Sequence, residues 1–216
     1  MACLKLEDEG VPRTHSAKRL SVIEAAANVF CREGYAGANI DLVAVEAGVC
    51  RQTIYNHHRD KEKLFQAVVQ TITERINAEI FATLATFPDK PTRLNQELTD
   101  FAVRMASDCL CSRDGKFLRK LLLSEGERYP ELFAAWREDG PDKTNAALAA
   151  RFARLALGGH LQLDDPDVAA RQFMALLFAD LQMTLTLGGK PSEERVRQSA
   201  EIAVTTFLRA YEKRKD

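Results

Sequence analysis

Six polar side chains crowd into residues 51 to 57 of this 216-residue chain, and only Ile54 among the seven is plainly apolar. A helix over this segment would bury little of its own surface. In the major groove of DNA such side chains have partners, because Arg pairs with guanine, Gln and Asn with adenine, and Thr with the thymine methyl group. Tyr and His reach phosphate oxygens. The segment therefore predicts a helix that contacts DNA through Arg51, Gln52, Thr53, Tyr55, Asn56 and His57; the alternative is a solvated polar helix.

The residues around this segment fit a helix-turn-helix. Ala44 is small enough for two helices to cross, Gly48 tolerates the positive φ of a tight turn, and Ile54 can seat the second helix. Asn39 can cap the first helix of the pair. Lys61 begins the next expected helix, where its ammonium and the free backbone N–H groups can meet a phosphate. The spacing alone is a moderate signal, since many helix pairs share an Ala and Gly pattern.

Helical periodicity recurs along the whole chain and strand signals are nearly absent, so we predict an all-α fold. After a flexible tail over residues 1–15, a DNA-binding head covers 16–62. Its three helices are expected over 16–33, from 40 to Gly48, and over 51–57. A long helix over about 60–86 joins the head to a ligand-binding and dimerisation body over 63–216. Further helices are expected over about 92–111, 113–127, after Pro130, 141–157, 166–187 and 192–213.

Composition and charge limit the possible functions. The chain is 46% hydrophobic and 28% charged, which is ordinary for a globular protein. Its net charge is −1, yet residues 11–63 hold eight Lys and Arg against six Asp and Glu, and DNA affinity depends on where the cations cluster. No run approaches the roughly 18 apolar residues of a membrane helix. Acidic residues stand at 7–9, where a secretory signal would be basic, so we expect a cytoplasmic protein without membrane contact.

The residue pattern does not suggest an enzyme. The sequence has no Gly-rich phosphate loop, no metal-spaced set of His, Asp and Glu, and no nucleophile elbow. We therefore expect no catalysis, no metal and no cofactor. Five cysteines, an odd number scattered along the chain, do not resemble a disulfide framework. The alternative function left open is a thiol or redox sensor that uses Cys109 or Cys111.

The segment from about 16 to 69 resembles the DNA-binding head of the TetR family of one-component regulators. The similarity lies in the run AANVFCREGYAGANI and in the motif GVCRQTIYNHHRDKEKLF. It implies that Arg51, Gln52, Thr53 and Asn56 face bases or the groove. It also implies that Tyr55, His57 and Lys61 hold phosphates, and that Asn39 stands where a Thr commonly caps the second helix and touches the DNA backbone.

Two positions depart from the family pattern. Cys50 stands where a Ser or Thr commonly begins the third helix, so we expect a weaker cap there. His58 replaces an apolar residue, usually Phe, beneath the expected recognition helix. We expect His58 to be a partly buried packing residue rather than a proton switch.

The C-terminal part resembles the AefR-like type of this family. The segments LLLSEGERYPELFAAWREDGPDK and DDPDVAARQFMALLFADL carry this similarity, which suggests no particular ligand. The resemblance implies a homodimer that reads an inverted repeat of double-stranded DNA and acts as a repressor. A small-molecule effector of unknown identity would tilt the long fourth helix, change the spacing of the two heads and release DNA.

Large apolar residues of the body suggest a ligand cavity and a dimer interface. Aromatic residues at helical spacing are often simply core, so this alternative stays open for each expected lining residue. The expected cavity lining is Phe101, Met105, Phe117, Leu121, Phe133, Trp136 and Phe173. The last two helices are too apolar to have one face covered, which predicts a four-helix interface with Phe178, Leu181, Leu185 and Phe207; the alternative is burial within one subunit.

Overall fold

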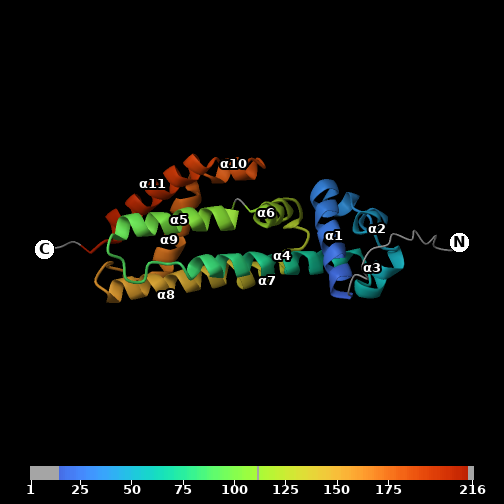
Figure 1. The fold of residues 1–216 in the computed structure, drawn as a ribbon, viewed down its shortest axis with the longest axis horizontal. Helices are drawn as coiled ribbons and strands as arrows, with labels where there is room; N and C mark the ends of the chain where they lie inside the picture. Colours follow the sequence, from blue (N-terminus) through green and yellow to red (C-terminus); the bar gives the residue numbers. More distant parts are fainter. Residues whose placement is uncertain (1–14, 111, 214–216) are drawn as a thin grey trace.

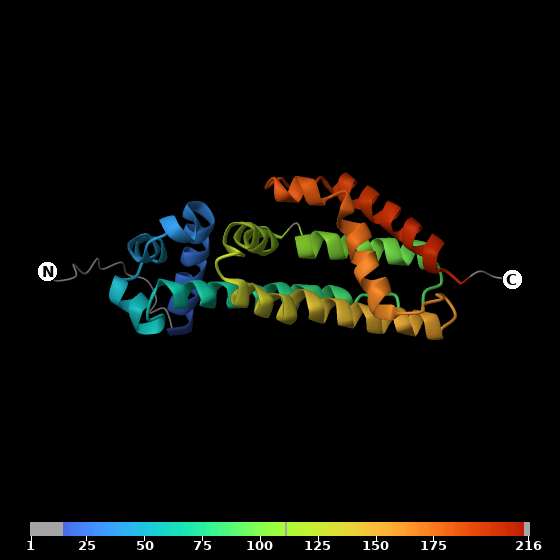
Figure 2. The same cartoon turned by 180° about the vertical axis from the view of Figure 1, so that it is seen from behind.

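The computed structural model describes residues 15–110 and 112–213, and its helices form an elongated molecule with a small head at one end. Figures 1 and 2 show the head, built from α1 to α3, joined to a longer helical body by α4. The described residues contain no strand beyond an isolated bridge between Leu161 and Glu212. The all-α prediction is therefore confirmed.

The head consists of α1 (His15–Gly37), α2 (Ile40–Ala47) and α3 (Arg51–His57). The predicted end of α1 at Gly34 coincides with a non-helical residue, φ 69° and ψ 172°, after which the chain makes one more helical turn. Only glycine adopts such a positive φ without strain. α1 packs against both α2 and α4, which holds the helix-turn-helix against the rest of the head.

α4 (Lys61–Leu84) connects the head to the body. Asp60 caps its first turn by accepting a hydrogen bond from the Lys63 N–H at 2.7 Å. Its buried side chains recur along its length, from Leu64 in the head to Leu84 in the body, so one rigid helix contributes to both cores. A displacement of its body half is therefore expected to move its head half.

The body contains α5 (Leu94–Leu110), α6 (Arg113–Glu125), α7 (Pro130–Arg137), α8 (Lys143–Leu157), α9 (Pro166–Ala179), α10 (Gln182–Thr186) and α11 (Glu193–Tyr211). α5 and α11 pack together, and α9 crosses between α8 and α11 (Figure 2). Ser112, Asp165 and Ser192 cap α6, α9 and α11 through their side-chain oxygens. This capping explains why the starts of these helices were predictable.

Two body elements differ from the prediction. α7 and α8 were expected as separate helices, but a single π-helical turn, Glu138–Asp142, joins them. Pro141 within this turn has no N–H to donate, which is compatible with the wider turn. A proline is usually a sign that a helix ends, so the sequence predicts two separate helices here. Conversely, the single helix expected over 166–187 is broken at Asp180, and the turn directs Leu181 and Leu185 into the core.

The core of the body is a cluster of aromatic rings. Phe152 lies 5.7 Å from Phe87, 5.3 Å from Phe173 and 4.8 Å from Phe207 between ring centroids, and Phe87 lies 4.9 Å from Phe101. Phe152 and Phe207 are stacked and the other three pairs are edge-to-face, and both arrangements add stability beyond simple burial at these distances. The rings come from helices far apart in sequence, so the cluster ties α5, α8, α9 and α11 together.

This cluster corrects several expected site residues. The expected interface residues Leu181, Leu185 and Phe207 are buried within the chain itself and present no surface to a partner. The same holds for most of the expected cavity lining: the buried side chains of Phe101, Met105, Phe117, Leu121, Phe133 and Phe173 belong to the core. Trp136 of that set lines a pocket, and Phe178, which is half-buried, lines the same pocket.

Candidate nucleic-acid interface

Local hydrogen bonds fix the start of α2 and the turn between α2 and α3. Asn39 Oδ1 accepts from the N–H groups of Asp41 and Leu42, at 2.6 and 3.1 Å, and so caps α2. Gly48 ends α2 with φ 64° and ψ 38°, a left-handed conformation that lets its N–H reach the carbonyls at the end of the helix. These geometries are those expected for a helix-turn-helix. They fix the direction in which α3 leaves the turn.

α3 is held by one buried side chain and exposes the rest. Ile54 is fully buried in the head core. Arg51, Gln52 and Asn56 are exposed, and the remaining predicted contact residues, Thr53, Tyr55 and His57, are half-buried. A seven-residue helix with a single buried anchor adds little to the stability of the core. Its exposed polar face therefore indicates a role in binding.

Side chains on this face are pre-ordered by bonds to one another. The Arg51 guanidinium lies 3.2 Å from a carboxylate oxygen of Asp41 and donates to the Tyr55 hydroxyl, also at 3.2 Å. Gln52 Nε2 donates to Asn56 Oδ1 at 2.9 Å. All these bonds are exposed, where they are weak, so base edges and phosphates can replace them at small cost. The arrangement brings together Arg51, Gln52, Tyr55 and Asn56 as predicted.

The two departures from the family motif have the expected structural effects. Cys50 precedes α3 but makes no side-chain hydrogen bond to the helix backbone, and its Sγ instead lies 3.2 Å from Thr53 Oγ1. That contact lowers the pKa of the Cys50 thiol. His58 is buried at 8% exposure, and its Nε2 has no hydrogen-bond partner among the described residues. It is a packing residue, as expected.

Replacing His58 with Phe should stabilise the head below neutral pH. Burial, and then the nearby charges of His57 and Arg19, lower the pKa of His58 from its usual value of 6.5. The unfolded chain therefore takes up a proton at a higher pH than the folded chain does. Stability is full above pH 6.5 and falls as the pH drops from 6.5 to the lowered folded pKa.

His58→Phe removes this titration, so the free energy of unfolding should lose that part of its pH dependence. It should also rise by about 1 kcal/mol at neutral pH, because a buried nitrogen without a partner is removed. Urea denaturation at pH 7.5 and pH 5, compared for the two chains, measures both effects. If the change in the free energy of unfolding between pH 7.5 and pH 5 is the same for both chains, His58 is protonated equally in the folded and unfolded states.

Lys61 occupies an unexpected position. Its Nζ donates to the Ala36 carbonyl at 3.2 Å and lies 4.6 Å from the centre of the Tyr35 ring. Burial, and then the neighbouring Arg128 cation, lower the pKa of the Lys61 ammonium. Lys61 stands at the N-terminus of α4, where the backbone also favours an anion. A phosphate there would compete with the Ala36 carbonyl for the ammonium, so the predicted phosphate contact requires a small side-chain movement.

Tyr35 forms a junction between head and body that sequence reasoning missed. Its N–H donates to Glu125 Oε1 at 3.3 Å, and its ring lies 5.1 Å from that of Tyr129 and 5.0 Å from the Arg128 guanidinium. Burial raises the pKa of its phenol. These partners stand at the end of α6 and before α7. The same ring that holds Lys61 therefore touches the body, and no local pattern in the sequence signals this contact.

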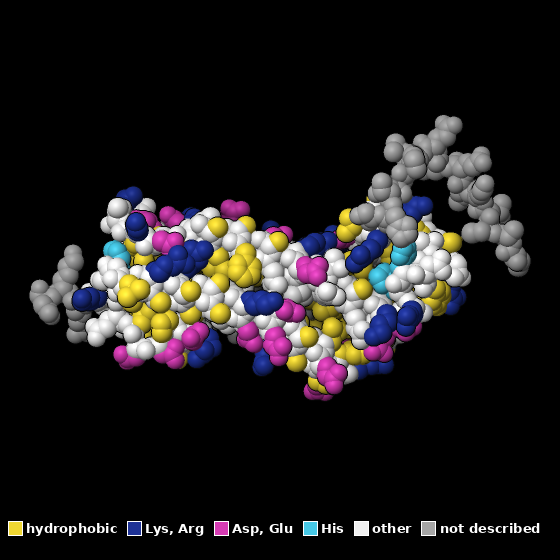
Figure 3. Space-filling view, turned by 90° about the horizontal axis from the view of Figure 1, so that it is seen from below, with side chains coloured by type: hydrophobic (Ala, Val, Ile, Leu, Met, Phe, Trp, Pro, Cys, Tyr) yellow, Lys and Arg dark blue, Asp and Glu magenta, His cyan; other side chains and the backbone are white. Residues whose placement is uncertain are grey.

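Charges at the junction reinforce it. Arg75 on α4 forms ion pairs with Glu24 of α1 and, at 2.8 Å, with Asp114 of α6. Lys120 donates to the carbonyl of Cys31. Figure 3 shows several Lys and Arg side chains at the end of the molecule that carries the head, so this end presents cations to the solvent. None of the helices in the described part of the chain is long and apolar enough to cross a bilayer.

These features define a helix-turn-helix regulator. A polar helix is exposed after a glycine turn, one apolar residue anchors it in the head, and a helical body follows. Comparison with known families agrees with this class. Residues 22–68 match the model of the bacterial regulatory proteins of the TetR family, and residues 96–213 match the AefR-like transcriptional repressor C-terminal domain. The second match covers more than half of the chain. The chain belongs to the TetR family.

Individual relatives are similar over different extents. The HTH-type transcriptional activator FasR of Mycolicibacterium smegmatis is 31% identical over 84 residues, 39% of this chain and 38% of FasR. The repressor SCO4008 of Streptomyces coelicolor is 40% identical over 58 residues, 27% of this chain and 30% of that protein. The chain thus spans about a third of the length of these two relatives. The repressor AcnR of Corynebacterium efficiens is 25% identical, covering 88% of this chain and 93% of AcnR.

Solved structures extend the similarity over the whole fold. A TetR-family transcriptional regulator from Mesorhizobium loti is 29% identical with a TM-score of 0.82, covering 92% of this chain and 99% of the other. The flavonoid-responsive regulator FrrA is 28% identical with a TM-score of 0.70, covering 93% and 100%. Head and body are therefore arranged as in these regulators.

Proposed function

We propose that this chain is a sequence-specific DNA-binding repressor that acts as a homodimer and is released from DNA by a small molecule. The observation that carries the proposal is the exposed face of α3. Four of its side chains, Arg51, Gln52, Tyr55 and Asn56, are positioned by Gly48 and Ile54. In a major groove Arg51, Gln52, Thr53 and Asn56 would face bases, while Tyr55, His57 and Lys61 would contact phosphates, with Asn39 beside the backbone.

A homodimer would present two such helices to one inverted repeat. Exposed apolar side chains support dimerisation through the last helices: Met183 is 69% exposed and Ile202 is 50% exposed. Ala175 and Ala179 are exposed on α9, four residues apart, and Met183 follows on α10 after the break at Asp180. These residues replace the buried Leu181, Leu185 and Phe207 as the proposed contact surface, because a partner can reach only exposed side chains.

Ile202→Glu should weaken both the dimer and DNA binding. Placing carboxylates on a shared apolar surface costs desolvation and repulsion, so the dimer dissociation constant should rise by about tenfold or more, equal to about 1.4 kcal/mol. Sedimentation equilibrium measures this, and a gel-shift titration gives the number of chains bound per duplex. Glu201→Gln, an exposed neighbour on the same helix, is the control. Unchanged association in Ile202→Glu would place the interface elsewhere.

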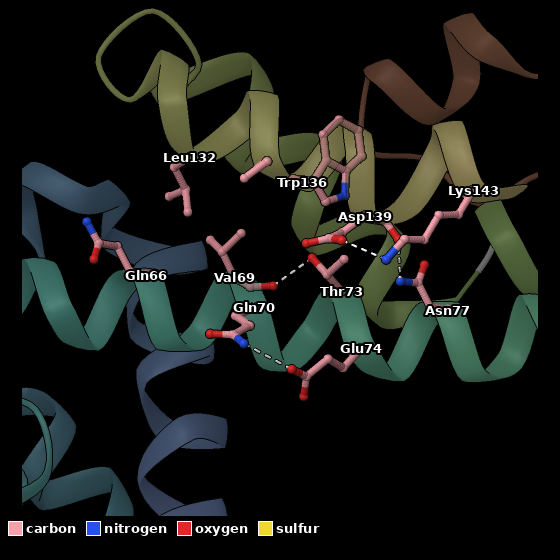
Figure 4. A pocket seen from close by; sticks show the side chains of 11 residues that line it. Gln66, Val69, Gln70, Thr73, Glu74, Asn77, Leu132, Trp136, Asp139 and Lys143 are labelled. Atoms are coloured by element: carbon pink, nitrogen blue, oxygen red, sulfur yellow. Dashed lines mark hydrogen bonds and ion pairs between the residues drawn. The ribbon is translucent and has the colours of Figure 1, made fainter.

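The body offers two adjacent spaces for an effector. We call the space along α4 and α7 the outer groove; Figure 4 shows Val69, Thr73 and Asn77 of α4 facing Leu132 and Trp136 of α7 across it. We call the second space the inner cavity; it is lined by residues of α4, α6, α8 and α9, by Trp136 of α7 and by Gly140 and Pro141 of the π-helical turn. Both spaces share Thr73, Asn77 and Trp136. A ligand there would contact α4 directly.

Release from DNA follows if the ligand prefers a conformation in which α4 is displaced. α4 carries Lys61 at its head end, and the Tyr35 junction ties α6 and α7 to the same place. Fluorescence anisotropy of a labelled duplex, titrated with protein in the presence and absence of a bound ligand, tests the coupling. Equal affinity under both conditions would exclude ligand release.

Nothing favours the thiol sensor: Cys111 and the Cys109 side chain lie outside the described residues.

A further inference from the structure

We propose that the inner cavity takes a compact, uncharged, largely apolar molecule of about two six-membered rings with one hydroxyl group, held between Asn77 and Trp136. The inference rests on the proposed function, in that the body binds an effector. It adds the chemical class of that effector.

The size of the cavity limits the molecule. Its volume is about 280 Å³. An apolar cavity of about 150 Å³ holds one benzene ring, so this one accommodates about two rings. A larger ligand would need the outer groove as well.

The walls are mainly apolar and include two aromatic side chains. Ile76, Ile80, Leu118 and Met174 supply aliphatic surface, and Trp136 and Phe178 supply ring faces for a planar ligand. Among the described residues that line the cavity, Arg119 is the single charged group and no carboxylate is present. A cationic ligand would therefore lose its hydration without a counter-ion. Arg119 already has an interaction partner within the chain, so it is not a free cation waiting for an anionic ligand, and an uncharged molecule is favoured.

Polar atoms of the wall define a place for a hydroxyl group. Asn77 Nδ2 donates to the Asp139 carbonyl at 2.8 Å, while its buried Oδ1 has no partner among the described residues. A methyl group placed on Gly140 would lie 3.6 Å from that oxygen and 3.7 Å from Trp136 Nε1, so both atoms face the same small space. One hydroxyl in van der Waals contact with Gly140, on the side toward which that methyl would project, can donate to Asn77 Oδ1 and accept from the Trp136 indole N–H.

Two further observations indicate a built site. Thr144 also lines the cavity; it is 4% exposed, and its Oγ1 has no hydrogen-bond partner in the described part of the chain. Native structures rarely leave such buried atoms unpaired. In addition, Gly140 and Pro141 enter the wall on the π-helical turn between α7 and α8, and single π turns are frequent at functional sites.

The test compares 2-naphthol, naphthalene and 2-naphthylmethylammonium as probes of the full chain by equilibrium dialysis without DNA. We expect 2-naphthol to bind about tenfold more tightly than either of the others. Gly140→Ala, whose methyl makes only ordinary contacts with the protein, should project into the space of the hydroxyl and weaken 2-naphthol about tenfold. Trp136→Phe should reduce the preference for 2-naphthol over naphthalene, and the change in naphthalene affinity alone controls for altered packing.

Equal binding of 2-naphthol and naphthalene, tighter binding of the ammonium, or unchanged 2-naphthol affinity in Gly140→Ala would overturn the inference. DNA affinity is measured separately by anisotropy with saturating 2-naphthol. If 2-naphthol binds as expected but DNA affinity stays constant, the ligand class stands and release by ligand fails. If 2-naphthol does not bind while the protein still recognises its operator, the ligand class alone fails.

Discussion

Replacing Gln52 or Asn56 with alanine should lower affinity for the preferred duplex by about 1–3 kcal/mol for each residue, because each change would remove the proposed contacts to one base edge. The effect should be confined to one base pair per half-site. Folding should be unaffected, since the 2.9 Å bond between these two exposed side chains adds little to stability. Anisotropy titrations on the preferred duplex and on its single-base variants measure the loss.

Tyr55→Phe and Lys61→Ala are the matched controls on the same surface. If these residues contact phosphates as proposed, both changes should weaken specific and random duplexes alike, and the lysine change should reduce the salt dependence of binding. An equal loss on specific and random DNA for Gln52→Ala and Asn56→Ala would mean that these two side chains also contact the backbone. The assignment of base and phosphate contacts to α3 would then be wrong.

Phe173→Ala should destabilise the body by about 3–5 kcal/mol, a large fraction of the roughly 5–15 kcal/mol that stabilises a domain. Phe173 is fully buried and lies 5.3 Å from Phe152 and 5.2 Å from Phe207. Removing the ring leaves a cavity in the centre of the aromatic cluster, where helices from four parts of the chain meet.

Urea denaturation followed by circular dichroism measures this loss. Phe81→Ala is the control, because Phe81 is a phenylalanine on α4 with 43% of its surface exposed, and it should cost far less. A loss below about 1 kcal/mol for Phe173→Ala would mean that the ring faces an open space. It would restore the interpretation of Phe173 as part of a ligand pocket.

The head could be predicted from the sequence because its determinants are local. Asn39 caps the helix that follows it, Gly48 adopts the conformation that glycine alone favours, and Ile54 is the single apolar residue of a short polar helix. Each rule acts within one or two turns of chain. The burial of His58 could be predicted for the same reason, because the position beneath α3 is normally occupied by an apolar side chain.

The body could be predicted only in part, because its contacts join distant segments. Periodicity identifies Phe173 and Phe207 as inward-facing, but it does not distinguish a cavity wall, a dimer interface and a core. The break at Asp180 was hidden by apolar residues that keep helical spacing on both sides. Likewise, the Tyr35 junction depends on Glu125, ninety positions away, and nothing near Tyr35 indicates that partner.

Selection of bound duplexes from a random pool by the purified full chain tests directly whether α3 recognises a DNA sequence. If a homodimer reads DNA through α3, the selected duplexes should share an inverted repeat whose half-sites lie about one helical turn of DNA or a multiple of it apart, and Gln52→Ala should relax one position in each half-site. Recovery of duplexes with no shared motif, at a salt concentration where binding is measurable, would contradict such recognition.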